Sequence, residues 1–433
     1  MLGALARASG RTLATTAAVT AAGFFSSVIT ARILGPEGRG LLSAALLIAT
    51  LSAGVSQFGL ANSFVYHRGA GWRFRYEALL AGSLLFVCVL AAALATGGVG
   101  LGDYADLRGH WPLIAALAGF TAAQNYLMSL SQLRAGLGFF NFMRFGLVFG
   151  NVAALLALLA LASAIGYADI LHAQLVVAAL LVPVGLLWIR RVLAQQVDGG
   201  ARAGQAGRWR DLLRYGVSHH GTVFLGLVLL NFDKIVLLKM GSVVQYGYYA
   251  LAFTTSRLVG ALQEAISTAL FARYAGKDAG ELSAGVRAAF RLTFLPMLLV
   301  AAAIAILSPW FIVLVFGAAF APMAAPFSIL LFECVIGGAS WMLAQRFNAD
   351  GRPGMVFARQ LVSVLPIFAA IPFLPERNLH LYLAGLMLAG ATLRLLVTLA
   401  LFPVALKEAV PQILPRIADL RALRLLFPRS RAA

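Results

Sequence analysis

Residues 152–162 have the sequence VAALLALLALA, and residues 298–307 have the sequence LLVAAAIAIL. Neither stretch contains a polar side chain. Long unbroken apolar runs are typical of helices that cross a bilayer, whereas the strands of an outer-membrane barrel alternate apolar and polar side chains. The two stretches therefore predict an all-α integral membrane protein.

The composition of the whole chain agrees with this fold class. Of 433 residues, 61% are hydrophobic and only 12% are charged, and the mean hydropathy is +0.88. Soluble domains carry about 25% charged residues, so an ordinary soluble domain and a disordered chain are both excluded. At about 20 residues for each crossing, the apolar residues suffice for roughly a dozen helices and leave no room for a large soluble domain.

Division of the chain at charges, glycines and prolines predicts twelve transmembrane helices in two six-helix bundles around a central cavity. Four domains follow: an N-terminal bundle (1–193), a cytoplasmic linker rich in Gly, Ala, Arg and Gln (194–211), a C-terminal bundle (212–405) and a basic tail (406–433). The helices are expected at 12–34, 41–66, 77–101, 112–134, 141–165, 170–191, 213–239, 244–270, 288–316, 324–347, 355–374 and 380–405.

Lys and Arg concentrate in alternate loops, as the positive-inside rule requires. This pattern predicts that both termini face the cytoplasm, and it makes most of the net charge of +18 a topology signal rather than a ligand site. In the tail, apolar Ile417, Leu420, Leu423 and Phe427 oppose Arg416, Arg421 and Arg424, which predicts an amphipathic helix on anionic lipid.

Traces of an internal repeat link the two bundles. Residues 35–40 (GPEGRG) follow the first helix, and residues 241–247 (GSVVQYG) follow the seventh. When Gly40 is aligned with Gly247, Gln57 falls opposite Glu264. A second coincidence places Arg144 eight residues after Gly136 and Arg359 eight residues after Gly351. Because six is even, two such copies would have the same orientation in the membrane.

Several ionisable residues fall inside predicted helices, where a charge costs at least about 2.5 kcal/mol on insertion scales. Arg257 and Glu264 are seven residues apart and therefore share a helix face that is expected to line a polar interior. Asp233 and Lys234 point about 100° apart on a helix, so we expect them to pair poorly with each other and to seek other helices. Structural ion pairs that only fix helix packing are the alternative for all four residues.

Three further sets of residues are candidates for binding or coupling. Glu333 is the most isolated carboxylate and suits a proton carrier, or else a buried acid with no transport role. Asn125, Ser129 and Gln132 form a polar stripe that could bind sugar hydroxyls or neighbouring helices. Arg144, Arg359 and Arg394 could bind phosphate, with the first two capturing it from the cytoplasmic side, or could simply be topological anchors.

Signatures of enzymes, metal sites and nucleic-acid binding are not found in the sequence. His219 and His220 lack the i, i+4 spacing of a zinc helix, and Cys88 and Cys334 lie in apolar segments and give no disulfide framework. No Walker or nucleophile-elbow pattern and no long extracytoplasmic loop with acidic pairs occurs. We therefore expect a protein that is not an enzyme and that needs no cofactor or metal.

Two motifs resemble a known family. Residues 29–40 (ITARILGPEGRG), with Gly59, Asn62 and Ser63 after them, are similar to the opening of the polysaccharide and O-antigen flippases. These flippases belong to the multidrug, oligosaccharidyl-lipid and polysaccharide exporter superfamily. Residues 232–235 (FDKI) and 247–252 (GYYALA) resemble the start of that family's second half. The twelve-helix topology extends the resemblance over nearly the whole chain.

The resemblance implies a flippase that moves a lipid-linked oligosaccharide, carried on polyprenyl diphosphate, to the outer leaflet of the bacterial cytoplasmic (inner) membrane by alternating access. For the lining of the substrate cavity it offers basic residues: Arg257, Lys234 and Arg394. The other candidates for that cavity are Glu264, Asp233, Gln57, Asn125 and Gln132, and Glu333 is the candidate for proton or sodium coupling.

The expected partners are the lipid-linked oligosaccharide, membrane lipids and polysaccharide polymerase machinery, with the chain itself a monomer. Three alternatives stay open: a cation-coupled multidrug antiporter, a lipid II flippase, and a membrane glycan polymerase or ligase. The first two predicted helices lack the embedded arginines associated with the lipid II branch, which weakens that reading.

Overall fold

The computed structural model describes residues 2–69, 76–100, 104–134, 138–195, 209–274 and 279–414, and all regular elements in these ranges are helices. The prediction of an all-α membrane protein is confirmed. The chain divides into two compact units, Met1–Gly247 and Tyr248–Ala433, and each is described by itself.

The first unit holds the helices up to α8 and the start of α9. Its elements are α1 (Leu2–Ser56), α2 (Leu60–Gly69), α3 (Tyr76–Val99), α4 (Ala105–Gly109), α5 (Trp111–Leu130), the 3-10 turn η1 (Ser131–Leu133), α6 (Gly138–Leu161), α7 (Tyr167–Gln195) and α8 (Trp209–Met240).

The second unit begins within α9 (Val243–Tyr274). It continues with α10 (Ala279–Phe316), η2 (Ala318–Met323), α11 (Ala324–Ala349), α12 (Pro353–Ala370), η3 (Ile371–Phe373), α13 (Leu379–Leu401) and a final π-helical turn, η4 (Phe402–Leu406).

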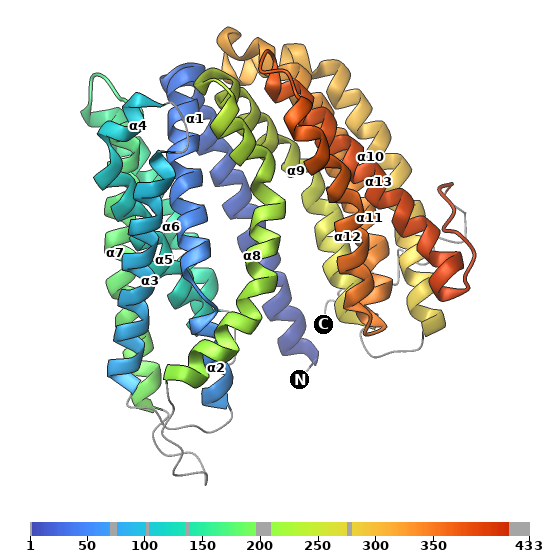
Figure 1. Cartoon of the computed structure of the whole chain (residues 1–433), viewed down its shortest axis with the longest axis horizontal. Coiled ribbons are helices and arrows are strands. Elements are labelled where there is room, and N and C mark those ends of the chain that lie inside the picture. The colour runs from blue at the N-terminus through green and yellow to red at the C-terminus, as the bar shows by residue number, and fades with distance from the viewer. Residues whose placement is uncertain are drawn as a thin grey trace. The chain divides into compact units, whose positions relative to one another are not determined.

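Two interruptions divide the long first helix. At Gly35, φ is 65° and ψ is −176°, values that a glycine adopts without strain, and Pro36 follows. Figure 1 shows α1 rising from the N-terminus and then descending towards α2. The second interruption is at residues 57–59, where Phe58 and Gly59 have positive φ. The predicted helix at 41–66 is therefore broken, because α8 approaches so closely that a Cβ on Gly59 would lie 2.5 Å from the Gly216 carbonyl oxygen.

Each predicted crossing corresponds to a helical segment. Among the described residues, nine segments are long and apolar enough to span a membrane, and the first of them, Ala18–His67, contains the reversal at Gly35. The helices α8 and α9 are each 32 residues long but carry the embedded charges. The orientation of the termini stays a prediction.

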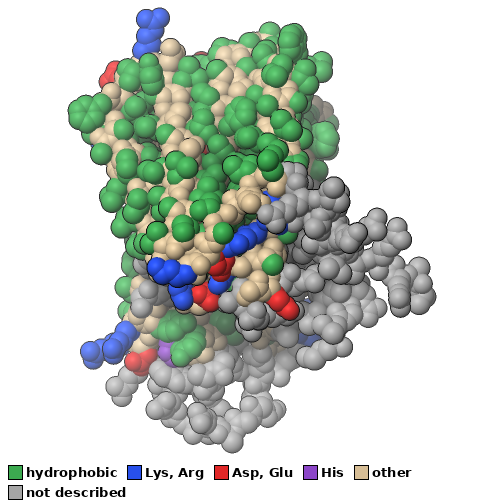
Figure 2. All heavy atoms as spheres, turned by 90° about the vertical axis from the view of Figure 1, so that its right-hand side faces the viewer, with side chains coloured by type: hydrophobic (Ala, Val, Ile, Leu, Met, Phe, Trp, Pro, Cys, Tyr) green, Lys and Arg blue, Asp and Glu red, His purple; other side chains and the backbone are tan. Residues whose placement is uncertain are grey.

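Large apolar side chains remain exposed along the helices, as expected where lipid rather than water is the solvent. On α10, the side chains of Leu299, Ile306, Trp310 and Leu314 are each more than 60% exposed. Figure 2 shows a face covered mainly by hydrophobic side chains, with charged side chains gathered towards its lower end.

The division into units falls later than the predicted linker. The helix α8 packs on α1 and α2, where the Ser63 hydroxyl donates to the Leu212 carbonyl oxygen at 2.9 Å and the rings of Tyr66 and Tyr215 stack at 4.3 Å. These contacts place α8 in the first compact unit. Residues 196–208 of the linker and 415–433 of the tail lie outside the described residues, so the domain boundaries and the amphipathic tail helix stay predictions.

The two glycines that the sequence aligns as equivalent meet in the first unit. A Cβ on Gly40 would lie 2.1 Å from the Val243 carbonyl oxygen, and a Cβ on Gly247 would lie 2.1 Å from the Pro36 carbonyl oxygen. Val243 precedes Gly247 by four residues, and Pro36 precedes Gly40 by four. The contact is therefore reciprocal, as a repeat of the two segments would produce.

Candidate functional site: an embedded charge cluster

Small residues bring α9 and α11 together in the second unit. A Cβ on Gly260 would lie 2.5 Å from Cys334 Sγ, and a Cβ on Gly338 would clash with Gln263 Oε1. The Gln263 amide donates to the Val335 carbonyl oxygen at 3.2 Å, which ties the two helices together. Such glycine-lined contacts allow close backbone approach in membranes and hold facing side chains at fixed distances.

One turn from these contacts, Arg257 of α9 forms an ion pair with Glu333 of α11. Arg257 Nη2 lies 2.5 Å from Glu333 Oε2. The Glu333 side chain is only 4% exposed, whereas that of Arg257 is 34% exposed. The Arg257 guanidinium also lies over the Phe253 ring at 4.2 Å, a cation–π contact that holds it in place. Arg257 is thus both anchored and accessible.

A second arginine reaches the same place from α13. Arg394 Nη2 and Glu333 Oε1 both border Gly337, at 3.2 Å and 3.5 Å from the position that a Cβ on this glycine would take. Arg394 Nη1 donates to Gln360 Oε1 of α12 at 3.1 Å. Four helices of the second unit therefore contribute to one polar cluster.

Arg359 of α12 completes the cluster from a fully buried position. It is 2% exposed, and its Nη1 donates to the Ser340 hydroxyl at 2.7 Å and to the Thr398 hydroxyl at 2.9 Å. We expected Arg359 to capture phosphate at the cytoplasmic surface. The structure instead places it inside the unit, where hydroxyls on α11 and α13 accept hydrogen bonds from its Nη1 while its buried Nε has no partner among the described residues. Its proposed role with phosphate stays untested.

We call Arg257, Glu333, Arg359, Gln360 and Arg394 the embedded cluster. It holds three guanidinium groups and one carboxylate, so its formal charge is +2. An arginine stays protonated in a protein, and excess charge in an apolar bundle is costly unless an anion compensates it. The arrangement is therefore chemically suited to bind an anionic group.

Replacement of Arg359 by Met tests whether this buried guanidinium is needed for the stability of the fold. The Ser340 and Thr398 hydroxyls lie 3.1 Å apart and can satisfy each other without the guanidinium. We expect Arg359→Met to change the free energy of unfolding by less than about 1.5 kcal/mol, because removal of one excess buried charge offsets the loss of its hydrogen bonds. Denaturant unfolding of the purified protein measures this change. A decrease of more than about 3 kcal/mol in the free energy of unfolding would show that the hydroxyls need the guanidinium.

The structure brings together only part of the expected site. Arg257, Glu333, Arg394 and Arg359 converge, whereas Glu264, on the same helix as Arg257, is exposed and is not the ion-pair partner of Arg257. Glu333, which we expected to be the most isolated carboxylate, is paired. Its coupling role and the cavity role of Glu264 stay predictions.

Asp233 and Lys234 correct one sequence-based expectation. We predicted that these neighbours would pair poorly, but Lys234 Nζ lies 3.4 Å from Asp233 Oδ1, and both residues are buried. The same ammonium donates to the Leu230 carbonyl oxygen at 3.0 Å. The prediction was wrong because the long lysine stem curls back over its own helix and brings its end to the carboxylate despite the divergent directions of the two Cβ atoms.

The other expected residues of the first unit do not join a single site. Gln57 donates to the carbonyl oxygens of Ala53 and Ala122, at 3.2 Å and 3.0 Å, and so satisfies groups at the helix break. The Asn125 side chain is half-buried, and Gln132 is exposed in η1 beyond the end of α5. Arg144 is half-buried, with its guanidinium 5.6 Å from the Phe140 ring centroid.

Sequence reasoning missed the uncharged members of the site, Gln360, Ser340 and Thr398. Thr398 follows Arg394 by four residues, a spacing that places both on one helix face, and Gln360 is adjacent to Arg359. These spacings were a usable signal. Among the described residues, no group of three or more His, Cys, Asp or Glu side chains could hold a metal ion.

Comparison with solved structures identifies the fold. A lipid II flippase, MurJ, in an inward closed conformation has a TM-score of 0.68 at 12% identity, with 95% of this chain and 90% of that chain covered. An inward-facing multidrug resistance MATE family transporter of the MOP superfamily has a TM-score of 0.58 at 15% identity, with coverage of 95% and 96%. The chain therefore has the fold of this class of membrane transporters.

The family follows from the sequence comparison. Residues 29–325 match the family described as polysaccharide biosynthesis protein, and this chain belongs to that family. The predicted resemblance to a family of polysaccharide biosynthesis is confirmed, and the fold agrees with the helical transporter fold that this resemblance implied. A comparison with curated proteins gives no match.

Proposed function

We propose that this protein is a flippase that moves a lipid-diphosphate-linked oligosaccharide from the cytoplasmic to the outer leaflet of the bacterial cytoplasmic membrane. The family and the transporter fold support a translocating protein in polysaccharide biosynthesis. The observation that carries the choice of substrate is the embedded cluster, whose formal charge of +2 suits a diphosphate better than a cationic drug.

In this proposal the ion pair of Arg257 and Glu333 is the resting state of the site. An arriving diphosphate offers several acceptor oxygens and more negative charge than one carboxylate, so it competes with Glu333 for the accessible Arg257 guanidinium. Arg394, which Gln360 positions, is the second donor. The oligosaccharide head stays solvated by polar groups while the lipid tail remains in the bilayer.

The same competition offers a route to ion coupling. Once the substrate takes Arg257, the buried Glu333 carboxylate loses its closest counter-charge. A proton or a sodium ion would then neutralise it, because an unpaired carboxylate in an apolar bundle is costly. Release of the substrate and return of Arg257 to Glu333 would expel the cation. We propose coupling of this kind, with alternating access and a monomeric protein that works beside the polymerase machinery.

The leaflet on which lipid-linked oligosaccharide accumulates tests the proposal. In cells that lack the protein, completed repeat units should accumulate on the cytoplasmic leaflet, and the intact gene should relieve this. We expect Arg257→Ala and Arg394→Ala to relieve it at most one tenth as well at equal expression. Arg377→Ala, a change at an exposed loop arginine, is the matched control and should behave as the unaltered protein.

Other outcomes point to other functions. Units that reach the outer leaflet and stall there would show a glycan polymerase or ligase. Accumulation of lipid II instead of oligosaccharide would show a lipid II flippase. Drug sensitivity without any change in either lipid would show a multidrug antiporter.

A further inference from the structure

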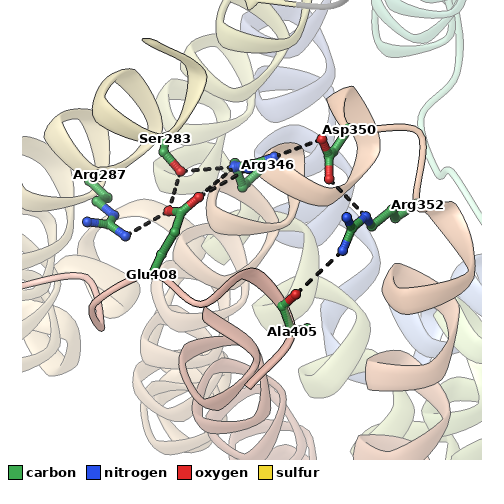
Figure 3. Close-up of polar contacts among 7 residues, drawn as sticks. All are labelled: Ser283, Arg287, Arg346, Asp350, Arg352, Ala405 and Glu408. Carbon is green, nitrogen blue, oxygen red and sulfur yellow. Dashed lines mark hydrogen bonds and ion pairs between the residues drawn. The ribbon is translucent and has the colours of Figure 1, made fainter. Parts of the chain in front are cut away.

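A second charged site lies in the second unit, apart from the residues of the embedded cluster. Ser283 and Arg287 lie one turn apart near the start of α10, and Arg346 lies in the last turn of α11. Figure 3 shows their polar ends directed at the carboxylate of Glu408, which follows η4. We call Ser283, Arg287 and Arg346 the arginine cradle.

Four donor groups of the cradle hold the Glu408 carboxylate. The Ser283 hydroxyl and Arg287 Nη2 both donate to Glu408 Oε2, the latter at 2.7 Å. Arg346 presents its Nε and Nη2 side by side to Oε1, at 3.3 Å and 3.1 Å. Arg346 Nε also lies 2.9 Å from Ser283 Oγ, which fixes the two residues relative to each other. Side-on arginine binding of this kind suits planar carboxylates and phosphates.

The Glu408 carboxylate alone does not satisfy all the hydrogen-bond donors of the cradle. Within the described part of the chain, the buried atoms Arg287 Nε and Arg346 Nη1 have no hydrogen-bond partner. Arg346 Nη1 meets Asp350 only as an ion pair at 3.4 Å, and Asp350 also pairs with Arg352 at 2.9 Å. Two cradle arginines thus face one negative charge from Glu408, and two N–H groups are left without an acceptor. A phosphate would supply both the extra charge and the extra oxygens.

The resident carboxylate can also be reached and released. The side chains of Glu408 and Arg287 are 21% and 23% exposed, so a solute can approach them, whereas that of Arg346 is 5% exposed. The segment after η4 has no helix or strand through residue 414, and most of its side chains are exposed. Its departure would therefore uncover little apolar surface.

We propose that the arginine cradle is a phosphate-binding site, in which Glu408 is the resident anion that a phosphate group displaces. The phosphate comes either from a lipid headgroup or from solution; both share the chemistry that the cradle recognises. Occupation by phosphate releases the segment after η4 from α10 and α11, and occupation by Glu408 fastens it. This site is independent of the flippase proposal, since it uses no residue of the embedded cluster.

Thermal unfolding of the full-length protein in lipid nanodiscs tests the site. Glu408→Gln keeps the size of the side chain and removes the competing charge; Glu376→Gln, at an exposed loop carboxylate, is the matched control. In phosphatidylcholine nanodiscs, inorganic phosphate should raise the Tm of Glu408→Gln at about tenfold lower concentration than that of the unaltered protein or of Glu376→Gln. Sodium chloride of equal ionic strength should not do so.

A second arm distinguishes the two sources of phosphate. If nanodiscs that contain phosphatidic acid raise the Tm of Glu408→Gln without added phosphate, the ligand is a lipid headgroup; if only inorganic phosphate acts, the ligand is soluble. Addition of Arg346→Gln to Glu408→Gln should abolish either response. Should that double variant fail to fold, Arg287→Gln, at the more exposed arginine, takes its place.

Two results would overturn the site. One is an equal response of Glu408→Gln, Glu376→Gln and the unaltered protein to phosphate in both arms. The other is a response that persists when the cradle arginine is replaced. Either result would mean that the contacts of Glu408 only hold the segment after η4 in place.

Discussion

Glu333→Gln is expected to lower the free energy of unfolding by about 3 kcal/mol, the lower end of the cost of breaking a buried ion pair, because the Arg257 side chain left behind is 34% exposed. The carboxylate is 4% exposed and is the acidic member of the embedded cluster, so its loss leaves Arg257 and Arg394 without their shared counter-charge. Denaturant unfolding of the purified protein measures the change. Arg352→Gln, at an exposed pair, should cost less than about 1 kcal/mol.

A double-mutant cycle separates the ion pair from other effects of the same change. Arg257→Gln combined with Glu333→Gln should cost less than the sum of the two single changes, because the double variant no longer leaves either member of this pair without the other. The two residues contact each other directly, so a coupling of more than about 1 kcal/mol is expected. Strict additivity would mean that the pair contributes nothing as a pair, and the resting state of the proposed site would have to be abandoned.

Gly247→Ala is the second change with a large expected effect. The new Cβ would lie 2.1 Å from the Pro36 carbonyl oxygen, and Gly40→Ala would meet the Val243 carbonyl oxygen at the same distance. Both obstacles are backbone atoms, so no side-chain rotation can relieve the overlap, and the helices must separate. We expect each change to cost roughly 3 kcal/mol or more, at the upper end for overpacking.

Gly226→Ala is the matched control for both glycines. Gly226 lies in the interior of α8, and a Cβ there would have no neighbour within 4 Å. Alanine should therefore stabilise this helix by about 1 kcal/mol. Tm values of the three variants provide the comparison. If Gly247→Ala were as stable as Gly226→Ala, the contact between residues 36–40 and 243–247 would be looser than described.

Much of the fold could be predicted from sequence because bilayer thickness fixes helix length and because charges and glycines mark the loops. The break at residues 57–59 could not, since it depends on the approach of α8 to Gly59, a contact between residues far apart in the chain. The division into compact units depends on contacts of the same kind, because α8 belongs to the first unit through its contacts with α1 and α2.

The candidate site shows the same limit. Arg257, Glu333, Arg359 and Arg394 stood out singly because charges are rare in apolar helices. Their interaction partners could not be identified from the sequence, because helical periodicity assigns residues to a face but does not say which helix packs against that face. Periodicity thus placed Arg257 and Glu264 on one helix face without naming a partner for either, and the glycines of α9 and α11 bring Arg257 to Glu333. A long, flexible side chain can also reach a partner that the direction of its Cβ atom does not indicate, as Lys234 does with Asp233.

The reciprocal approach of Gly40 and Gly247 has the geometry of an isologous interface, in which two identical chains meet about a two-fold axis and each contact occurs twice. In a homodimer, a substitution alters both copies of such a contact at once. Here one chain carries both segments, so the two copies can be altered separately. A difference in cost between Gly40→Ala and Gly247→Ala would therefore measure directly how far the two copies have diverged from equivalence.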